Sequence, residues 1–124
     1  MRRAVLMTGL ALTLVPTAVQ AMTVSEFLAK ADALKAKGVL ALASPDVGLL
    51  RQEIMSASAA YRAGLDAQIA AGRKPSSCPP PKGTAKVTSD DILKEFRSLP
   101  PAGQKANVKD AFAAFMTKRY PCKA

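Results

Sequence analysis

The two cysteines of the chain, Cys78 and Cys122, constrain its fold more than any other feature, because they are the only ones it has. An even cysteine count is typical of a structural disulfide when a chain is exported. A redox pair is the alternative, but its cysteines usually lie close in sequence. A metal site is another, but it needs more ligands than two cysteines in a chain without histidine. A disulfide here would close a loop of roughly 45 residues and, in the chain-entropy model, stabilise the folded state by about 4 kcal/mol.

The start of the chain has the pattern of an export signal. Arg2 and Arg3 precede an apolar stretch over 4–15, and small residues lie before Ala21. We expect cleavage after Ala21, which leaves residues 22–124 as a periplasmic or secreted domain without an integral membrane anchor. The stretch is shorter than the 20 or so apolar residues that span a bilayer, and an uncleaved signal anchor is the alternative.

The charge of the mature chain is strongly positive. Removing Arg2 and Arg3 lowers the formal net charge from +9 to +7. Such a charge favours anionic partners, including cell-wall polymer, lipid headgroups or an acidic protein, while a solubilising surface charge is the simpler interpretation. Nucleic acid fits poorly, because the chain is exported and its basic residues are scattered among acidic ones.

The apolar periodicity is helical throughout and predicts an all-α single domain, a small bundle of about four helices. We expect the first helix to begin at a capping box on Thr23 and to end at Gly38. The second begins at Ser44 and runs to Gly72. The third begins at Thr88 or Ser89 and ends at Pro100-Pro101, and the last begins at Asn107. The disulfide would then close the ends of a C-terminal αα-hairpin.

The same periodicity predicts which side chains are buried. Residues 39–43 are apolar but few, and they fit either a helical turn or a buried connector. Small side chains over 56–60 would let a neighbouring helix or a second subunit approach closely. The expected core side chains are Val24, Phe27, Leu28, Ala31, Leu34, Val47, Leu50, Ile54, Ala57, Tyr61, Leu65, Ile69, Ile92, Leu93, Phe96, Leu99, Val108, Ala111, Phe112, Phe115 and Met116.

Residues 73–87 form a loop in this interpretation, because Pro79, Pro80 and Pro81 prevent a regular helix. We favour a rigid connector over a proline-rich recognition segment, since three prolines are few for the latter.

No combination of residues indicates catalysis. The chain has no histidine, which excludes Ser–His and Cys–His nucleophiles and imidazole zinc ligands. Asp90 and Asp91 are the obvious carboxylate pair, but a helix N-terminus favours acids without any chemistry. Glu53 and Asp66 fit a solvated helix face. We therefore expect no enzyme, no cofactor and no metal.

Several short motifs resemble the Rap/Tai-type immunity proteins over residues 58–122. Their family pattern has a Cys-Pro entry into a helix, a proline-containing turn, and a second helix that ends in aromatic-Pro-Cys; upstream is a Tyr-x-x-Gly-apolar element. The residues that carry the resemblance are Tyr61, Gly64-Leu65, Cys78-Pro79, Lys82-Gly83, Val87-Thr88, Asp91-Ile92-Leu93, Phe96, Pro100, Ala111-Phe112, Phe115-Met116 and Tyr120-Pro121-Cys122.

The resemblance implies a periplasmic helical protein that binds and occludes a toxin delivered by type VI secretion, such as a cell-wall amidase. The best-known members are dimeric, so it also implies a homodimer. Members commonly carry further cysteines near the Tyr-x-x-Gly element, where this chain has Ser58, Ala59 and Ala60, which excludes a second disulfide. The alternative function is a general envelope protein, either a cell-wall-associated structural factor or a small periplasmic chaperone.

Overall fold

The structure is a computed structural model that describes residues 21–123. The expected signal peptide, apart from Ala21, lies outside the described residues. Within them the chain forms five α-helices, one 3-10 helix and no strand. The order is α1 (Val24–Lys37), η1 (Gly38–Ala43), α2 (Pro45–Ala70), α3 (Ser89–Ser98), α4 (Pro101–Gln104) and α5 (Val108–Arg119). The all-α prediction is confirmed.

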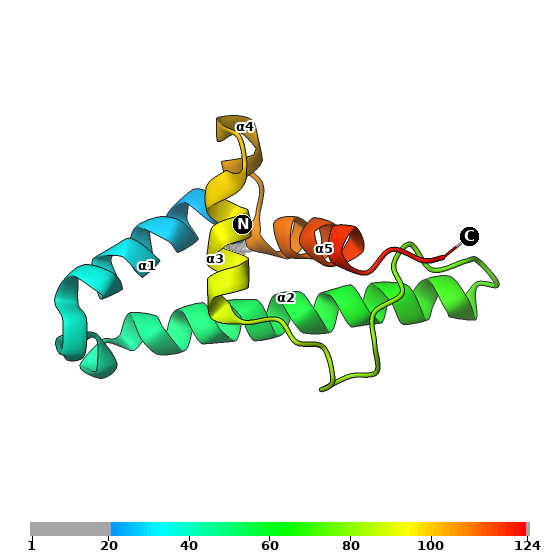
Figure 1. The fold of residues 1–124 in the computed structure, drawn as a ribbon, viewed down its shortest axis with the longest axis horizontal. Helices are drawn as coiled ribbons and strands as arrows, with labels where there is room; N and C mark the ends of the chain where they lie inside the picture. The colour runs from blue at the N-terminus through cyan, green and yellow to red at the C-terminus, as the bar shows by residue number, and fades with distance from the viewer. Residues whose placement is uncertain (1–20, 124) are drawn as a thin grey trace, which may run out of the picture.

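Figure 1 shows α2 as the long axis of the molecule. With 26 residues it is about 39 Å long at 1.5 Å per residue. At one end η1 turns the chain from α1 into α2, and α1 rises away from α2 to meet α3. Towards the other end α5 runs beside α2, and the loop after α2 passes the C-terminal segment. The two ends of α2 therefore carry different parts of the chain.

Each long helix begins where local side-chain chemistry predicts. The hydroxyls of Thr23 and Thr88 accept from the third helical amide, and the acids three residues later return the bond in two capping boxes. Ser44 caps α2 ahead of a proline in the first turn, and Asn107 caps α5. Of the two candidates for the third helix, the structure selects Thr88.

The core lies where α1, α3 and α5 meet the middle of α2. The rings of Phe27 and Phe96 pack edge to face at 5.5 Å, and those of Tyr61 and Phe112 at 6.2 Å. Val24 and Val108 are fully buried, and their amides bond to Ala106 and Met22 across the start of the two helices. The beginning of the described chain is thus fixed to the beginning of α5.

Of the two alternatives for residues 39–43, the structure selects the helical turn, because they lie in the 3-10 helix η1, whose large side chains are exposed. Three expectations need correction. Ile69 is 58% exposed, since α5 ends before the last turn of α2. Ala31, Leu34, Val47, Leu50, Ile54, Leu93, Leu99 and Ala111 are half-buried rather than buried. Pro101 follows the end of α3 and also begins the short helix α4, so the C-terminal hairpin contains a third helix between α3 and α5.

Candidate functional site: an apolar surface and a basic end

The predicted disulfide between Cys78 and Cys122 is present, with the Cα atoms 4.9 Å apart. It joins the loop before α3 to the segment after α5, so it closes the hairpin as expected. The amide of Cys78 also donates to the carbonyl of Tyr120 at 2.8 Å. The pair is a structural clamp at one end of the molecule.

Ser77, next to this clamp, organises a buried hydroxyl network that sequence reasoning missed. Its Oγ donates to the carbonyl of Tyr120 at 2.9 Å and lies 2.6 Å from Oη of Tyr61. Because the single hydroxyl proton of Ser77 goes to that carbonyl, Tyr61 donates to Ser77. Ser77 is 1% exposed. The network ties α2, the loop and the end of α5 together, and no nucleophile is presented to solvent there.

Of the carboxylates singled out from the sequence, Asp91 has structural contacts. The backbone amide of Thr88 donates to Oδ2 of Asp91 at 2.9 Å and lowers the pKa of that carboxyl. Asp90 is exposed, Glu53 is half-buried and Asp66 is exposed on α2. A hydrogen bond from Arg97 similarly lowers the pKa of Asp32 and joins α3 to α1 at 2.6 Å. Asp91 therefore caps a helix, as the capping interpretation predicted, and Asp32 forms an ion pair with Arg97.

An open apolar groove of about 400 Å³ lies between α1, α2 and α3. Phe27, Ala31 and Leu34 line it from α1. The α2 wall consists of half-buried Val47, Leu50 and Ile54 and exposed Arg51 and Met55, and Ile92 and Leu93 line the groove from α3. The groove exists because α1 and α2 meet at η1 and move apart towards α3 (Figure 1). It is therefore an apolar surface left uncovered by the chain's own helices.

The 3-10 helix η1 adds an exposed apolar tip where α1 and α2 meet. Val39, Leu40 and Leu42 are 84%, 73% and 85% exposed. They follow Leu34 of the groove wall by a few residues and precede Val47 of the opposite wall. We call Val39, Leu40 and Leu42 the apolar tip. We call the tip and the groove together the apolar surface.

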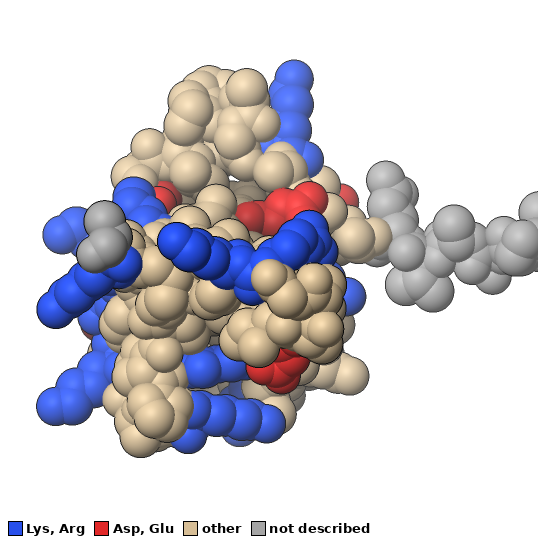
Figure 2. All heavy atoms as spheres, turned by 90° about the vertical axis from the view of Figure 1, so that its right-hand side faces the viewer, with Lys and Arg blue, Asp and Glu red and all other residues tan. Residues whose placement is uncertain are grey.

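The charges are distributed unequally along the molecule. Residues 22–56 hold four Lys or Arg and four Asp or Glu, whereas residues 57–123 hold twelve against five. The net charge of +7 therefore belongs to the second part of the chain. Figure 2 looks at the end of the molecule opposite η1, where Lys and Arg side chains project from several sides and acidic side chains cover smaller areas.

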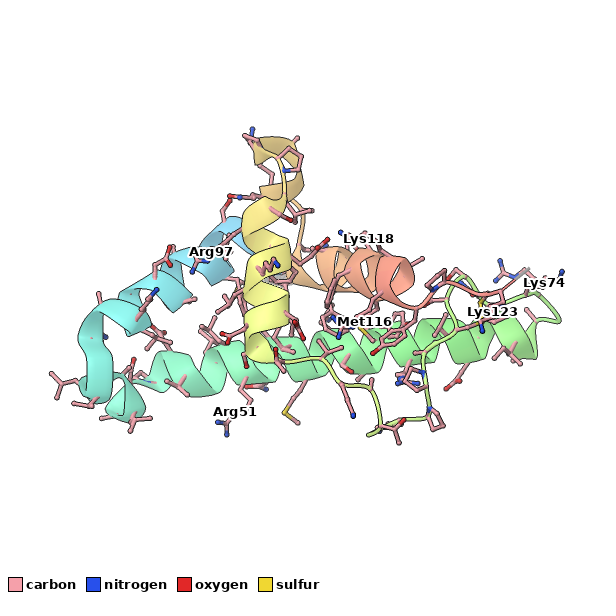
Figure 3. The ribbon with its side chains drawn as sticks, viewed as in Figure 1. Arg51, Lys74, Arg97, Met116, Lys118 and Lys123 are labelled. Carbon is pink, nitrogen blue, oxygen red and sulfur yellow. A yellow bond between two sulfur atoms is a disulfide. The ribbon has the colours of Figure 1, made fainter. Side chains whose placement is uncertain are left out.

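The clamp lies within this basic region. Figure 3 places Lys74 and Lys123 together at the end where α2 and the C-terminal segment finish, with Lys118 on the neighbouring α5. Arg51 lies well away on the other part of α2. Arg119 donates from Nη2 to the carbonyl of Lys86 at 2.8 Å, which holds the proline-rich loop against α5.

Sequence reasoning found the disulfide but neither of the two surfaces. The uneven count of acids along the chain was the available signal for the basic end. The apolar tip had a signal in the run Val-Leu-Ala-Leu, but burial of such a run depends on what packs against it.

Within residues 21–123, no cluster of His, Cys, Asp and Glu could hold a metal ion, and no helix is long and apolar enough to cross a membrane. Comparisons with protein-family models, curated proteins and solved structures gave no match.

Proposed function

We propose that the chain is an exported binding protein without catalytic activity that neutralises a toxin delivered by type VI secretion, such as a cell-wall amidase. The resemblance to the Rap/Tai-type immunity proteins motivates the choice of partner. The observation that carries the proposal is the apolar surface, whose tip exposes Val39, Leu40 and Leu42 almost completely. A solvated tip of this kind costs free energy until a partner removes it from water.

The shape of this surface fits steric occlusion. The tip protrudes at the turn between two helices (Figure 1), so it can enter a cleft on another protein. Leu49 and Met55, 41% and 64% exposed on α2, extend the apolar area beside it. Interfaces commonly have an apolar centre surrounded by a polar rim, and Lys35, Lys37 and Arg51 are exposed around this area.

The proposal is tested by protection of bacteria. A cell-wall hydrolase encoded beside this chain is directed to the periplasm of a host, with or without the chain. We expect lysis to stop only when the chain is co-exported, and the two proteins to co-purify. Lysis at the same rate, together with no complex between the purified proteins, would contradict the proposal.

The contact surface is tested with a matched pair of variants. Leu40→Ser with Leu42→Ser should weaken binding at least about tenfold, because burial of each leucine is worth about 1.5–3 kcal/mol. Ile69→Ser is the control, since Ile69 is also exposed but lies in the last turn of α2. Equal binding by both variants would place the toxin contact elsewhere.

Light scattering of the chain alone measures its mass in solution and so tests for the homodimer that the resemblance implies. We propose that a dimer, where formed, leaves the apolar tip free, so the tip variants keep the mass of the native protein. A dimer that these variants convert to a monomer would assign the tip to self-association and overturn its role in toxin contact.

A further inference from the structure

Two segments that contain no Asp or Glu are joined by the disulfide towards the end of the molecule opposite the apolar tip, and the loop after Cys78 returns along α2 to α3 (Figure 1). They span residues 67–89 and 111–123. The disulfide Cys78–Cys122 and the hydrogen bond from Arg119 to the carbonyl of Lys86 hold them together. Their cations, which we call the basic end, are Arg73, Lys74, Lys82, Lys86, Lys118, Arg119 and Lys123.

Most of these cations have no protein counter-charge in the part of the chain that the structure describes. Lys118 and Arg119 pair with Glu95 and Asp91 of α3. The other five are exposed and form no ion pair among residues 21–123. The nearest acids along the chain, Asp66, Asp90 and Asp110, lie one residue outside the two segments. The basic end therefore repels itself and attracts multivalent anions.

We propose that the basic end binds a flexible polyanion, a polymer that carries closely spaced phosphate or carboxylate groups. Five of the seven cations are lysines. A lysine ammonium acts as a point charge, whereas recognition of one anionic group in a fixed orientation favours the planar fork of arginine. The basic end therefore recognises the charge density of the polymer rather than the orientation of one anionic group.

The distribution of the cations favours a polymer over a membrane surface. Lys and Arg side chains project from several sides of this end (Figure 2), so a flexible chain can reach more of them than a plane can. Binding to a bilayer also uses an apolar face. Of the large exposed hydrophobic side chains, only Ile69 lies in the last turn of α2, next to the basic end.

The aromatic residues argue against a nucleic acid. Binding to single-stranded DNA or RNA draws on bases stacked on aromatic side chains. Phe27, Phe96, Phe112, Phe115 and Tyr61 are all buried. Tyr120 is half-buried with the guanidinium of Arg119 over its ring at 5.9 Å. The basic end offers charge without a stacking platform.

The test measures binding of fluorescent polyphosphate to the native protein as the salt concentration rises. The logarithm of the affinity falls with the logarithm of salt in proportion to the number of cations engaged. With the coefficient for a single-stranded polyanion, seven cations predict a loss of about a thousandfold between 50 and 200 mM salt.

Two triple variants with the same net charge locate the site. Arg73→Gln, Lys74→Gln and Lys123→Gln remove three of the seven cations, so the same change of salt should weaken binding only about fiftyfold. Lys35→Gln, Lys37→Gln and Arg51→Gln remove three exposed cations from the other part of the molecule and should retain the native slope. Circular dichroism checks that both variants keep their helices.

Equal slopes for the two triple variants would overturn the proposal, because net charge rather than the basic end would then determine binding. So would native protein that binds neither polyphosphate nor polyglutamate at 50 mM salt. Binding to polyphosphate alone would show that the ligand carries phosphate groups, and binding to polyglutamate alone that it carries carboxylate groups.

Tighter binding to oligothymidylate, or to vesicles of phosphatidylglycerol, than to both polymers would replace the proposal with a nucleic-acid or membrane site. Toxin capture does not enter this experiment, so the proposed function and this inference can fail separately.

Discussion

Removing the disulfide should lower the stability of the domain substantially. Cys78 and Cys122 are separated by 44 residues, and a closed loop of this size corresponds to about 4 kcal/mol of unfolded-state entropy. A net stability of about 5–15 kcal/mol is usual for a domain. A change of 1 kcal/mol moves the melting temperature of a 100-residue domain by about 4 °C. We therefore expect a decrease of about 15 °C.

The assay is thermal unfolding of the mature protein followed by circular dichroism, with Cys78→Ser and Cys122→Ser combined so that no free thiol remains. Native protein in excess reductant is the matched control, and its melting temperature should equal that of the double variant. The hydrogen bond between the amide of Cys78 and the carbonyl of Tyr120 can persist in both. A melting temperature within about 2 °C of the oxidised native value would refute the argument that the clamp limits the unfolded chain.

Three further predictions concern particular side chains. Ser77→Ala should lower the free energy of unfolding by about 1–3 kcal/mol, because it leaves the buried Oη of Tyr61 without its acceptor. Ser76→Ala, at an exposed position, is the control, and equal unfolding free energies for the two variants would contradict the network. Leu65→Ala should lower the free energy of unfolding by about 2–5 kcal/mol and Ile69→Ala by less than about 0.5 kcal/mol, since Leu65 is 7% and Ile69 58% exposed. Denaturant titration measures both, and a reversed order would contradict the packing of α5 on α2. The lowered pKa of Asp91 stabilises the fold above its ordinary pKa of 3.8, and this contribution is lost as pH falls through the folded value. Asp91→Ala should therefore melt below the native protein at pH 7 and by a smaller margin near pH 2; a margin independent of pH would refute the role of the charge.

Local chemistry made the helix starts predictable from the sequence. Thr23, Ser44 and Asn107 can each accept a bond from an amide two or three residues later, and a cap needs nothing from the rest of the fold. The disulfide was predictable for a similar reason, because the chain has only two cysteines.

Features that depend on which segments meet were not predictable. Leu42 is a typical core residue but is 85% exposed, because η1 lies at the turn between α1 and α2 and none of the described helices covers it. Pro101 was interpreted only as a helix terminator, although proline also suits a first helical turn. The basic end requires residues 67–89 and 111–123 to lie together, which the clamp and the packing of α5 on α2 determine.

Hydrogen exchange of the chain with and without a purified hydrolase against which it protects cells tests the proposed contact most directly. The account predicts slower amide exchange over residues 34–55, which contain the apolar tip and the α2 wall of the groove, at a concentration that inhibits the hydrolase. The loop over 71–88 should exchange at its free rate. Unchanged exchange over 34–55, with slowing confined to the basic end or absent everywhere, would contradict it.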